Sequence, residues 1–346
     1  MSRRNVRVED ISKRKETSNC LSLIKMFAAL QVMYGHFVEH LELSVPQWFS
    51  VGIGFFRGVP IFFILSGFLI WFSMKRSSSY SIYLRKRFWR IYPELWLAIV
   101  IGIITILIFY HGWNTKHLVM FSITQGTLFQ FWTPDSLRGY GCGTPNGTLW
   151  TIGVMVQFYV VAWPIKYLLQ KKKWPIWLIG FAILVGMSCF GDMLIEKLGS
   201  EICIKLFDQT IIRYLWLFYI GCFIAEFNNV LLKTLKKTWY LLIMAGIIPY
   251  LTEIDIFAGY YVFWSVLLVS GLIGFAYRFP QLAIKRDISY GLFLFHMIIV
   301  NVFITIGWVG NWWYALFALV LSVICAYVSN ITLGEWSSRR KIKLVK

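Results

Sequence analysis

Long apolar runs alternate with short polar segments along most of the chain. A helix that crosses a bilayer needs ~20 mainly apolar residues, and about ten runs approach this length. The pattern predicts an all-α, polytopic transmembrane helical bundle of about ten spans. Polar tails are expected at 1–19 and 333–346, with a transmembrane domain over 20–332. The spans are expected at 20–40, 52–74, 91–111, 150–169, 174–194, 208–226, 238–252, 259–277, 288–307 and 312–332.

Basic residues mark one side of the predicted membrane. The loops of the other side hold fewer of them and carry acids such as Glu42, Asp135, Glu253 and Asp255. Because cytoplasmic loops are enriched in Lys and Arg, the alternation predicts that both termini are cytoplasmic. The predicted cytoplasmic clusters are Arg3, Arg4, Arg7, Lys13, Arg14 and Lys15; Lys75, Arg76, Arg85, Lys86, Arg87 and Arg90; Lys166 and Lys171 to Lys173; Lys233, Lys236 and Lys237; Arg278, Lys285 and Arg286; and Arg339, Arg340, Lys341, Lys343 and Lys346.

The composition decides how the charge is interpreted. A net charge of +18 alone would favour a nucleic-acid partner. The cations are divided among short clusters between apolar runs, however, and 58% of the 346 residues are apolar while only 14% are charged. This composition excludes an ordinary soluble domain. We therefore expect the lipid bilayer as a partner, and no nucleic acid.

The longest predicted outer loop, 112–149, contains a glycine-rich stretch at 139–147. Loops of this length are often functional, and this one is a candidate lid. The six cysteines have no metal-ligand spacing, so no metal site is expected. A disulfide between Cys142 and Cys203, both on the predicted outer side, is an open alternative.

Two ionisable residues of the first span are candidates for chemistry. Lys25 and His36 are eleven residues apart, so they share one helix face and differ in depth by ~16 Å. Ionisable groups inside a bilayer are costly and usually functional. His36, toward the outer leaflet, is therefore a candidate catalytic residue. The alternative is a hydrogen-bonded packing role.

Two arginines precede the third span. Arg87 and Arg90, three residues apart on a predicted helix, point the same way. Guanidinium groups bind phosphate oxygens bidentately, so this pair is a candidate site for the phosphates of a nucleotide-containing donor. The alternative is a cytoplasmic membrane anchor. In the second span, the small residues Ser66 and Gly67 predict close helix packing.

Five motifs follow one another along the chain. They are Lys25 with His36, Gly58-Val-Pro-Ile-Phe-Phe-Ile-Leu-Ser-Gly-Phe68, Arg87-Phe-Trp-Arg-Ile-Tyr-Pro93, Leu149-Trp-Thr-Ile-Gly-Val-Met-Val-Gln-Phe-Tyr159 and Ser289-Tyr-Gly-Leu-Phe-Leu-Phe-His296. Together and in this order they resemble the acyltransferase-3 family of integral-membrane enzymes. Members typically move an acyl group, often acetyl from acetyl-CoA, onto a hydroxyl of a surface or secreted glycan. The resemblance implies acyl-CoA binding by Lys25, Arg87 and Arg90, and a site lined by Ser66, Gln157, Tyr159 and Tyr290.

The chain departs from the family pattern at two positions. Lys25 stands where the family usually has Arg, and Met155 stands where it usually has an acid. A carboxylate could orient and stabilise a catalytic imidazole, which methionine cannot do. Glu39, three residues after His36, is a candidate replacement because it lies on the same helix face. His296 is a further catalytic candidate, with a structural role as the alternative.

The resemblance implies an acyltransferase in the cell membrane, specifically a bacterial cytoplasmic membrane. His36 would act as a general base or receive the acyl group itself. The expected co-substrate is acyl-CoA, in particular acetyl-CoA, with no bound cofactor. The expected acceptor is a polysaccharide, glycan or lipid-linked glycan reached from outside. The alternatives are a saccharide transporter or export component without acyl transfer, and an inactive or regulatory membrane protein.

Overall fold

A computed structural model describes residues 19–130, 132–252 and 262–343, and within these residues it contains helices and connecting turns but no strand. The predicted all-α fold is confirmed for this part of the chain. The physical reason is that lipid offers no hydrogen-bond partner to the backbone, and a helix pairs its own N–H and C=O groups.

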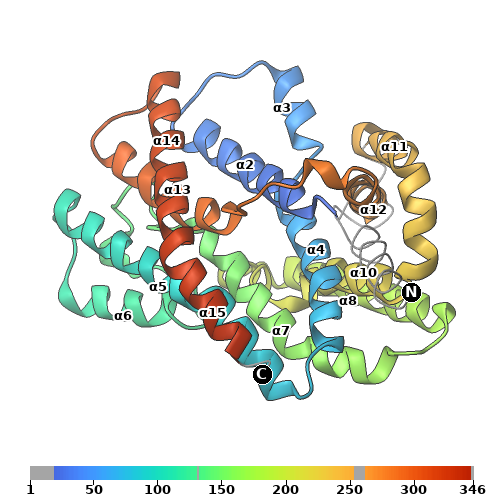
Figure 1. Cartoon of the computed structure of the whole chain (residues 1–346). Helices are drawn as coiled ribbons and strands as arrows, with labels where there is room; N and C mark the ends of the chain where they lie inside the picture. Colours follow the sequence, from blue (N-terminus) through green and yellow to red (C-terminus); the bar gives the residue numbers. More distant parts are fainter. Residues whose placement is uncertain (1–18, 131, 253–261, 344–346) are drawn as a thin grey trace, which may run out of the picture. The chain divides into compact units, whose positions relative to one another are not determined.

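A helix forms at each predicted span (Figure 1). These helices are α2 (Leu21–His40), α4 (Gly58–Lys75), α5 (Tyr80–Phe109), α7 (Trp150–Leu169), α8 (Trp174–Leu198), α10 (Ile211–Glu226), α11 (Asn228–Thr252), α12 (Val262–Arg278), α13 (Ser289–Thr305) and α14 (Trp312–Ser329). Shorter helices are α3 (Gln47–Gly54), α6 (Thr115–Gln125), α9 (Glu201–Phe207) and α15 (Glu335–Lys343), with 3-10 turns at Asp135–Leu137, Gly147–Leu149 and Pro280–Leu282 and a π turn at Asn330–Gly334.

The number of spans differs from the predicted ten. Among the described residues, six helical segments are long and apolar enough to cross a membrane, and Glu201–Glu226 with Asn228–Thr252 adds a seventh if that interrupted pair is one span. The apolar helices α12 and α13 have 17 residues each, fewer than the ~20 that a full crossing needs. The chain is thus a multi-pass membrane protein, and about ten spans are not confirmed. The predicted eighth span begins at 259, within 253–261, which lie outside the described residues.

The described residues belong to two compact units. The smaller unit joins the residues up to Phe27 with Phe227–Asp287, and the larger unit joins Ala28–Glu226 with Ile288–Lys346. The predicted tail at 1–19 lies almost wholly outside the described residues. Within the predicted tail at 333–346, Glu335–Lys343 form α15, which packs on α5 with the rings of Trp336 and Trp89 5.1 Å apart.

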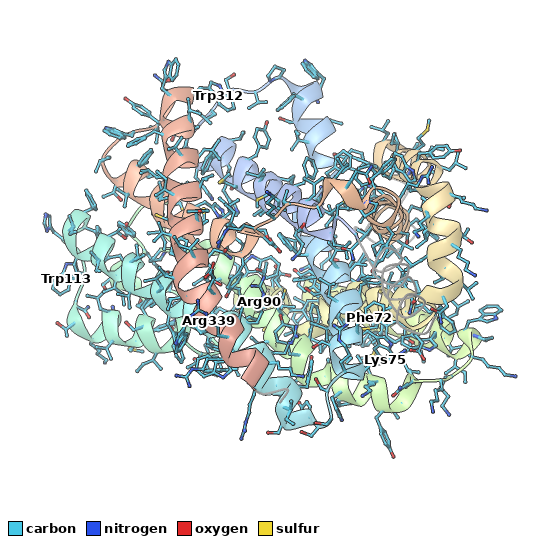
Figure 2. All side chains as sticks on the ribbon, viewed as in Figure 1. Phe72, Lys75, Arg90, Trp113, Trp312 and Arg339 are labelled. Atoms are coloured by element: carbon cyan, nitrogen blue, oxygen red, sulfur yellow. The ribbon has the colours of Figure 1, made fainter. Side chains whose placement is uncertain are left out.

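Figure 2 shows the labelled Lys75 and Arg339 of the larger unit in the lower half of the view and Trp312 at the top, with Trp113 and Arg90 at heights between them. The predicted sidedness of these residues stays a prediction. Cys142 and Cys203 are separate free thiols in the structure.

The larger unit is built around a close crossing of α4 and α10. Gly67 and Gly221 face each other, since a Cβ at Gly67 would overlap the Phe218 carbonyl and one at Gly221 would overlap the Ile64 carbonyl. Hydrogen at these positions lets the two backbones touch, as the sequence predicted for Gly67. Next to the crossing, Phe158 of α7 lies 4.8 Å from Phe218 between ring centroids. The crossing therefore positions α7 as well.

We expect Gly67→Leu to destabilise the protein, because the added side chain forces α4 and α10 apart at an overpacking cost of about 1–3 kcal/mol. Gly186→Leu is the matched control, since Gly186 of α8 is exposed and has no heavy atom within 4 Å of an added Cβ. Thermal unfolding of both detergent-purified variants checks this. Equal melting temperatures would contradict the close crossing.

Candidate active site

Two histidines from helices far apart in sequence form a pair inside the larger unit. His36 Nδ1 lies 2.9 Å from His296 Nε2, and the two rings are 14° from parallel with centroids 5.2 Å apart. The rings therefore meet edge to edge in nearly one plane, as a hydrogen bond between ring nitrogens requires. His296 is fully buried, whereas His36 is half-buried.

The backbone of α13 determines where the protons of this pair lie. His296 Nδ1 is 2.8 Å from the Leu292 carbonyl oxygen, and because a carbonyl only accepts, Nδ1 of His296 donates. In a neutral ring the other nitrogen, Nε2, is then an acceptor, so His36 Nδ1 donates to it. The remaining nitrogen of His36, Nε2, keeps its lone pair. This is the tautomer in which His36 can accept a proton from a substrate.

A third imidazole lies one turn further along α2. The ring of His40 stacks on His36 at 5.7 Å between centroids. No group of three or more His, Cys, Asp or Glu among the described residues is arranged to hold a metal ion. The expectation of no metal site stays a prediction.

Glu39 faces a different neighbour from the one that the sequence suggested. Its side chain is exposed, and the hydrogen-bond partner of the His36 ring is His296. The pKa of the Cys142 thiol is raised, first by partial desolvation and also by the negative charge of Glu39. Glu39 therefore lies near the 139–149 segment, and its role as a substitute for the missing acid stays a hypothesis.

Residues 139–149, here called the anchored loop, are fastened to α13 by Asn301. The Asn301 Oδ1 accepts from the Cys142 N–H at 2.8 Å, and its Nδ2 lies 3.0 Å from the carbonyl oxygens of Thr144 and Pro145. Gly141 has φ +57°, and a Cβ there would overlap the Asn301 amide, so only glycine fits. These contacts favour a loop that is held in place against α13 over the movable lid that the sequence suggests.

A second set of contacts holds the anchored loop about two turns earlier on α13. Asn146 Nδ2 donates to the Leu294 carbonyl at 2.9 Å, and the Thr148 hydroxyl donates to the Phe293 carbonyl at 3.1 Å. The loop is thus bonded to the same turns of α13 that carry His296.

Arg87 lies between two tyrosine rings. Its Cζ is 5.8 Å from the centroids of both Tyr83 and Tyr159, and Nη2 donates to the Ser73 hydroxyl at 2.7 Å. Its Nε is buried and has no hydrogen-bond partner among the described residues. A buried donor without a partner costs about 1–3 kcal/mol, so this guanidinium is suited to a bound anion.

Arg90 completes what we call the arginine–tyrosine cluster: Tyr83, Arg87, Arg90, Tyr159 and Tyr290. The Cζ of Arg90 lies 5.7 Å from the centroid of Tyr290, and the Tyr290 hydroxyl donates to the Ile91 carbonyl at 3.0 Å. Because Tyr290 and His296 are six residues apart on α13, they differ by about 9 Å along its axis. One helix therefore contributes to both the cluster and the histidine pair.

Three other predicted site residues make local contacts. Lys25 forms an ion pair with Asp287 in the smaller unit. The Ser66 hydroxyl lies 3.5 Å from the sulfur of Met155. Gln157 binds the turn before α10, accepting from the Ile211 N–H at 3.0 Å and donating to the Gln209 carbonyl at 2.9 Å, which is a structural contact.

Sequence reasoning missed two buried polar residues beside these groups. Asn301 could have been found as a polar residue inside an otherwise apolar span. Glu94, four residues after Arg90 on α5, is 3% exposed and accepts from the Ser329 hydroxyl at 3.1 Å. Its carboxylate gives the cationic cluster a neighbouring negative charge.

The larger unit thus holds a neutral histidine pair and a cationic arginine–tyrosine cluster, and comparison with known proteins gives the class of the protein. Residues 18–331 match the acyltransferase-3 family, described as an acyltransferase domain. The chain belongs to this family and is an acyltransferase, as the sequence resemblance implied.

The similar proteins come from bacteria and a bacterial virus. The chain is 28% identical to "Nodulation protein 10" of Rhizobium leguminosarum over 355 residues, covering 94% of this chain and 95% of that protein. It is 26% identical to an "O-acetyl transferase" of Shigella phage Sf6, covering 94% and 98%. Over an alignment of 138 residues it is 31% identical to the peptidoglycan O-acetyltransferase OatA of Listeria monocytogenes, covering 36% of this chain and 22% of that one. No solved structure is significantly similar to this chain.

We expect Asn301→Ala to release the anchored loop and speed maleimide labelling of Cys142 severalfold, because three backbone groups of the loop lose their partner. Asn311→Ala is the control, since Asn311 caps α14 by accepting from the Trp313 N–H at 2.9 Å. Mass-spectrometric mapping of the Cys142 adduct gives the rates. Equal rates in the wild type and both variants would show that Asn301 does not hold the loop.

Proposed function

We propose that this protein transfers an acetyl group from acetyl-CoA to a hydroxyl of a cell-surface or secreted polysaccharide, at the cytoplasmic membrane of a bacterium. Two of the similar proteins are named as O-acetyltransferases, one of them acting on peptidoglycan. The hydrogen bond between His36 and His296 carries the proposal, because it leaves the lone pair of His36 Nε2 available to accept a proton.

The reaction uses His36 as a general base. His36 Nε2 takes the proton of the acceptor hydroxyl while the oxygen attacks the thioester carbonyl. The tetrahedral intermediate collapses, the C–S bond breaks, and the proton passes from His36 to the departing thiolate, giving free CoA and the ester. His36 returns to the neutral tautomer from which it began.

His296 takes the orienting role that the family usually gives to a carboxylate. His296 Nε2 accepts a hydrogen bond from the Nδ1–H of His36. The ring of His296 is held in place by its own hydrogen bond to the Leu292 carbonyl. When His36 becomes an imidazolium, the same hydrogen bond spreads the positive charge toward His296. His296 is thus a positioning residue that also stabilises the charged state.

The arginine–tyrosine cluster is the proposed binding site for the CoA phosphates. Arg87 offers a buried Nε that has no hydrogen-bond partner in the described part of the chain, and Arg90 lies against Tyr290. Because Tyr290 and His296 share α13, a donor held by its phosphates at the cluster can extend along this helix, bringing the thioester to His36. The acceptor would reach the same nitrogen from the outer side.

The test of the function is the ester content of the host's surface polysaccharide. We expect one O-acetyl group to disappear when the gene is deleted, to return with the wild-type gene, and not to return with His36→Ala, since general-base catalysis contributes about 10²–10⁴-fold. NMR of the purified polysaccharide checks this. Unchanged acetylation after deletion, or full recovery with His36→Ala, would contradict the proposal.

Replacements of His296 separate positioning from packing. We expect His296→Leu to lower kcat about as much as His36→Ala with little change in KM for acetyl-CoA, because His36 then loses its acceptor. His296→Gln keeps an oxygen acceptor near the position of Nε2, so it should retain part of kcat. Glu39→Gln is the control and should keep near-wild-type kcat. A large loss with Glu39→Gln but not with His296→Leu would assign the orienting role to Glu39 instead.

Arginine replacements test donor binding. We expect Arg87→Gln and Arg90→Gln each to weaken acetyl-CoA binding by ten-fold or more, because a charge-assisted hydrogen bond contributes about 1.5–3 kcal/mol. Arg85→Gln is the charge-matched control, since Arg85 is exposed on the same helix. Isothermal calorimetry with the purified protein measures the binding. If all three variants bind equally, the phosphates bind elsewhere.

A further inference from the structure

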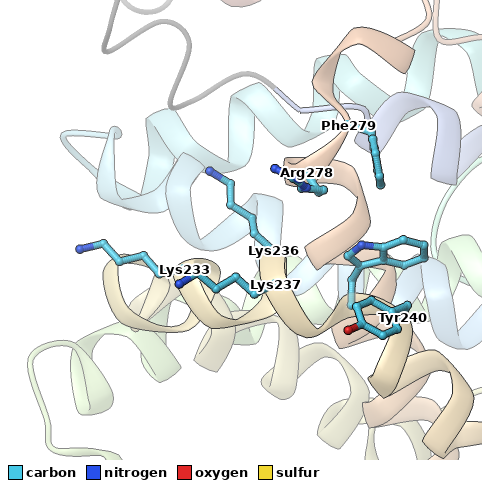
Figure 3. A pocket seen from close by; sticks show the side chains of 7 residues that line it. Lys233, Lys236, Lys237, Tyr240, Arg278 and Phe279 are labelled. Carbon is cyan, nitrogen blue, oxygen red and sulfur yellow. The ribbon is translucent and has the colours of Figure 1, made fainter.

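The smaller unit contains a cationic pocket outside the proposed active site. It has a volume of about 770 Å³ and lies between α11 and the end of α12. Its seven lining residues include no carboxylate; they are Lys233, Lys236, Lys237, Trp239, Tyr240, Arg278 and Phe279. Figure 3 shows Lys236 of α11 and Arg278 of α12 extending toward the same region.

Helix geometry explains why the cations gather there. Lys233, Lys236, Lys237 and Tyr240 follow the spacing i, i+3, i+4, i+7, so they share one face of α11. On α12, a Cβ at Gly274 would overlap the Leu235 carbonyl of α11. This close approach fixes the two helices together, and Arg278, one turn beyond Gly274, is then held at the first turns of α11 that carry the lysines.

The wall beside the cations is aromatic. The Trp239 ring packs edge-on against Phe279 at 5.7 Å and against Tyr240 at 5.8 Å between centroids. The pocket thus presents four cations next to a continuous apolar surface. Like charges collected without a lining carboxylate repel one another, and an anion relieves this repulsion.

We propose that this pocket binds the phosphate headgroup of an acidic phospholipid. The cations match the phosphate, and the rings match the glycerol backbone and the first methylenes of the acyl chains, since aromatic side chains favour the interface between headgroups and hydrocarbon. Basic pockets between membrane helices on the cytoplasmic side bind anionic headgroups, and the charge pattern predicts this side for all four cations. The proposal is independent of the acyl transfer reaction.

A simple topological anchor would need the cations but neither the shared pocket nor the aromatic wall. Lys172 and Lys173 provide the comparison, because they are exposed neighbours in a predicted cytoplasmic loop and do not line the pocket. Removing two charges at either place changes the net charge equally.

The experiment measures lipid retention by the full-length protein purified in mild detergent. Native mass spectrometry after addition of equal amounts of phosphatidylglycerol and phosphatidylcholine should show selective retention of phosphatidylglycerol. Lys236→Gln/Arg278→Gln should weaken it about thirtyfold, at roughly 1 kcal/mol per cation. Lys172→Gln/Lys173→Gln should leave it unchanged, and the charge-preserving Lys236→Arg/Arg278→Lys should largely retain it.

Two competitors distinguish the source of the phosphate. Millimolar inorganic phosphate and millimolar CoA should not displace phosphatidylglycerol from the wild type, because neither fills the aromatic wall with acyl methylenes. Displacement by CoA would assign the pocket to a nucleotide and overturn the proposal, as would equal losses in the two neutralised variants.

A photoreactive phosphatidylglycerol on the wild type should cross-link within 233–240 or 278–279, and cross-links only elsewhere would also overturn the proposal.

Discussion

The structure depends on a constraint that lipid imposes: a polar group inside a bilayer must find its partner within the protein. For the backbone the solution is the helix. For side chains the solution is a contact that selects which helices meet, as when Trp71 and Lys75 of α4 both bind Glu226 at the end of α10. The His36–His296 hydrogen bond obeys the same rule, so one contact joins α2 to α13 and also defines the proposed base.

Local pattern was enough to predict the helices, because hydropathy acts over one helix length. Each expected span contains a helix, and α2 matches its predicted range within one residue. The number of crossings depends on what neighbouring helices allow. The close approach of Gly274 to the Leu235 carbonyl, for example, joins residues 39 positions apart in the sequence. Composition carries no signal for these contacts.

The proposed site was predictable residue by residue but not as an arrangement. His36 and His296 were each identified as costly polar residues inside spans, whereas their hydrogen bond joins positions 260 residues apart, which no helical spacing reveals. For Glu39, the spacing from His36 predicts a shared helix face but not that its charge also lies near Cys142 of the anchored loop. That loop is held by Asn301, so its position depends on a contact that helix spacing does not reveal.

A neutral partner for His36 has a physical logic in this chain. A carboxylate orients an imidazole and stabilises its charged form, but it must itself be buried as an ion, which is expensive in lipid. Met155 stands where the family usually has an acid, and its sulfur lies 3.5 Å from the Ser66 hydroxyl. In the proposed mechanism His296 supplies orientation without a permanent charge. Burying the neutral resting pair therefore costs less free energy than burying an ion pair. The free-energy penalty falls on the transition state instead, where the positive charge of the imidazolium is shared between two rings and faces no anion. An enzyme built this way would gain stability in the bilayer and give up part of the rate that a carboxylate provides.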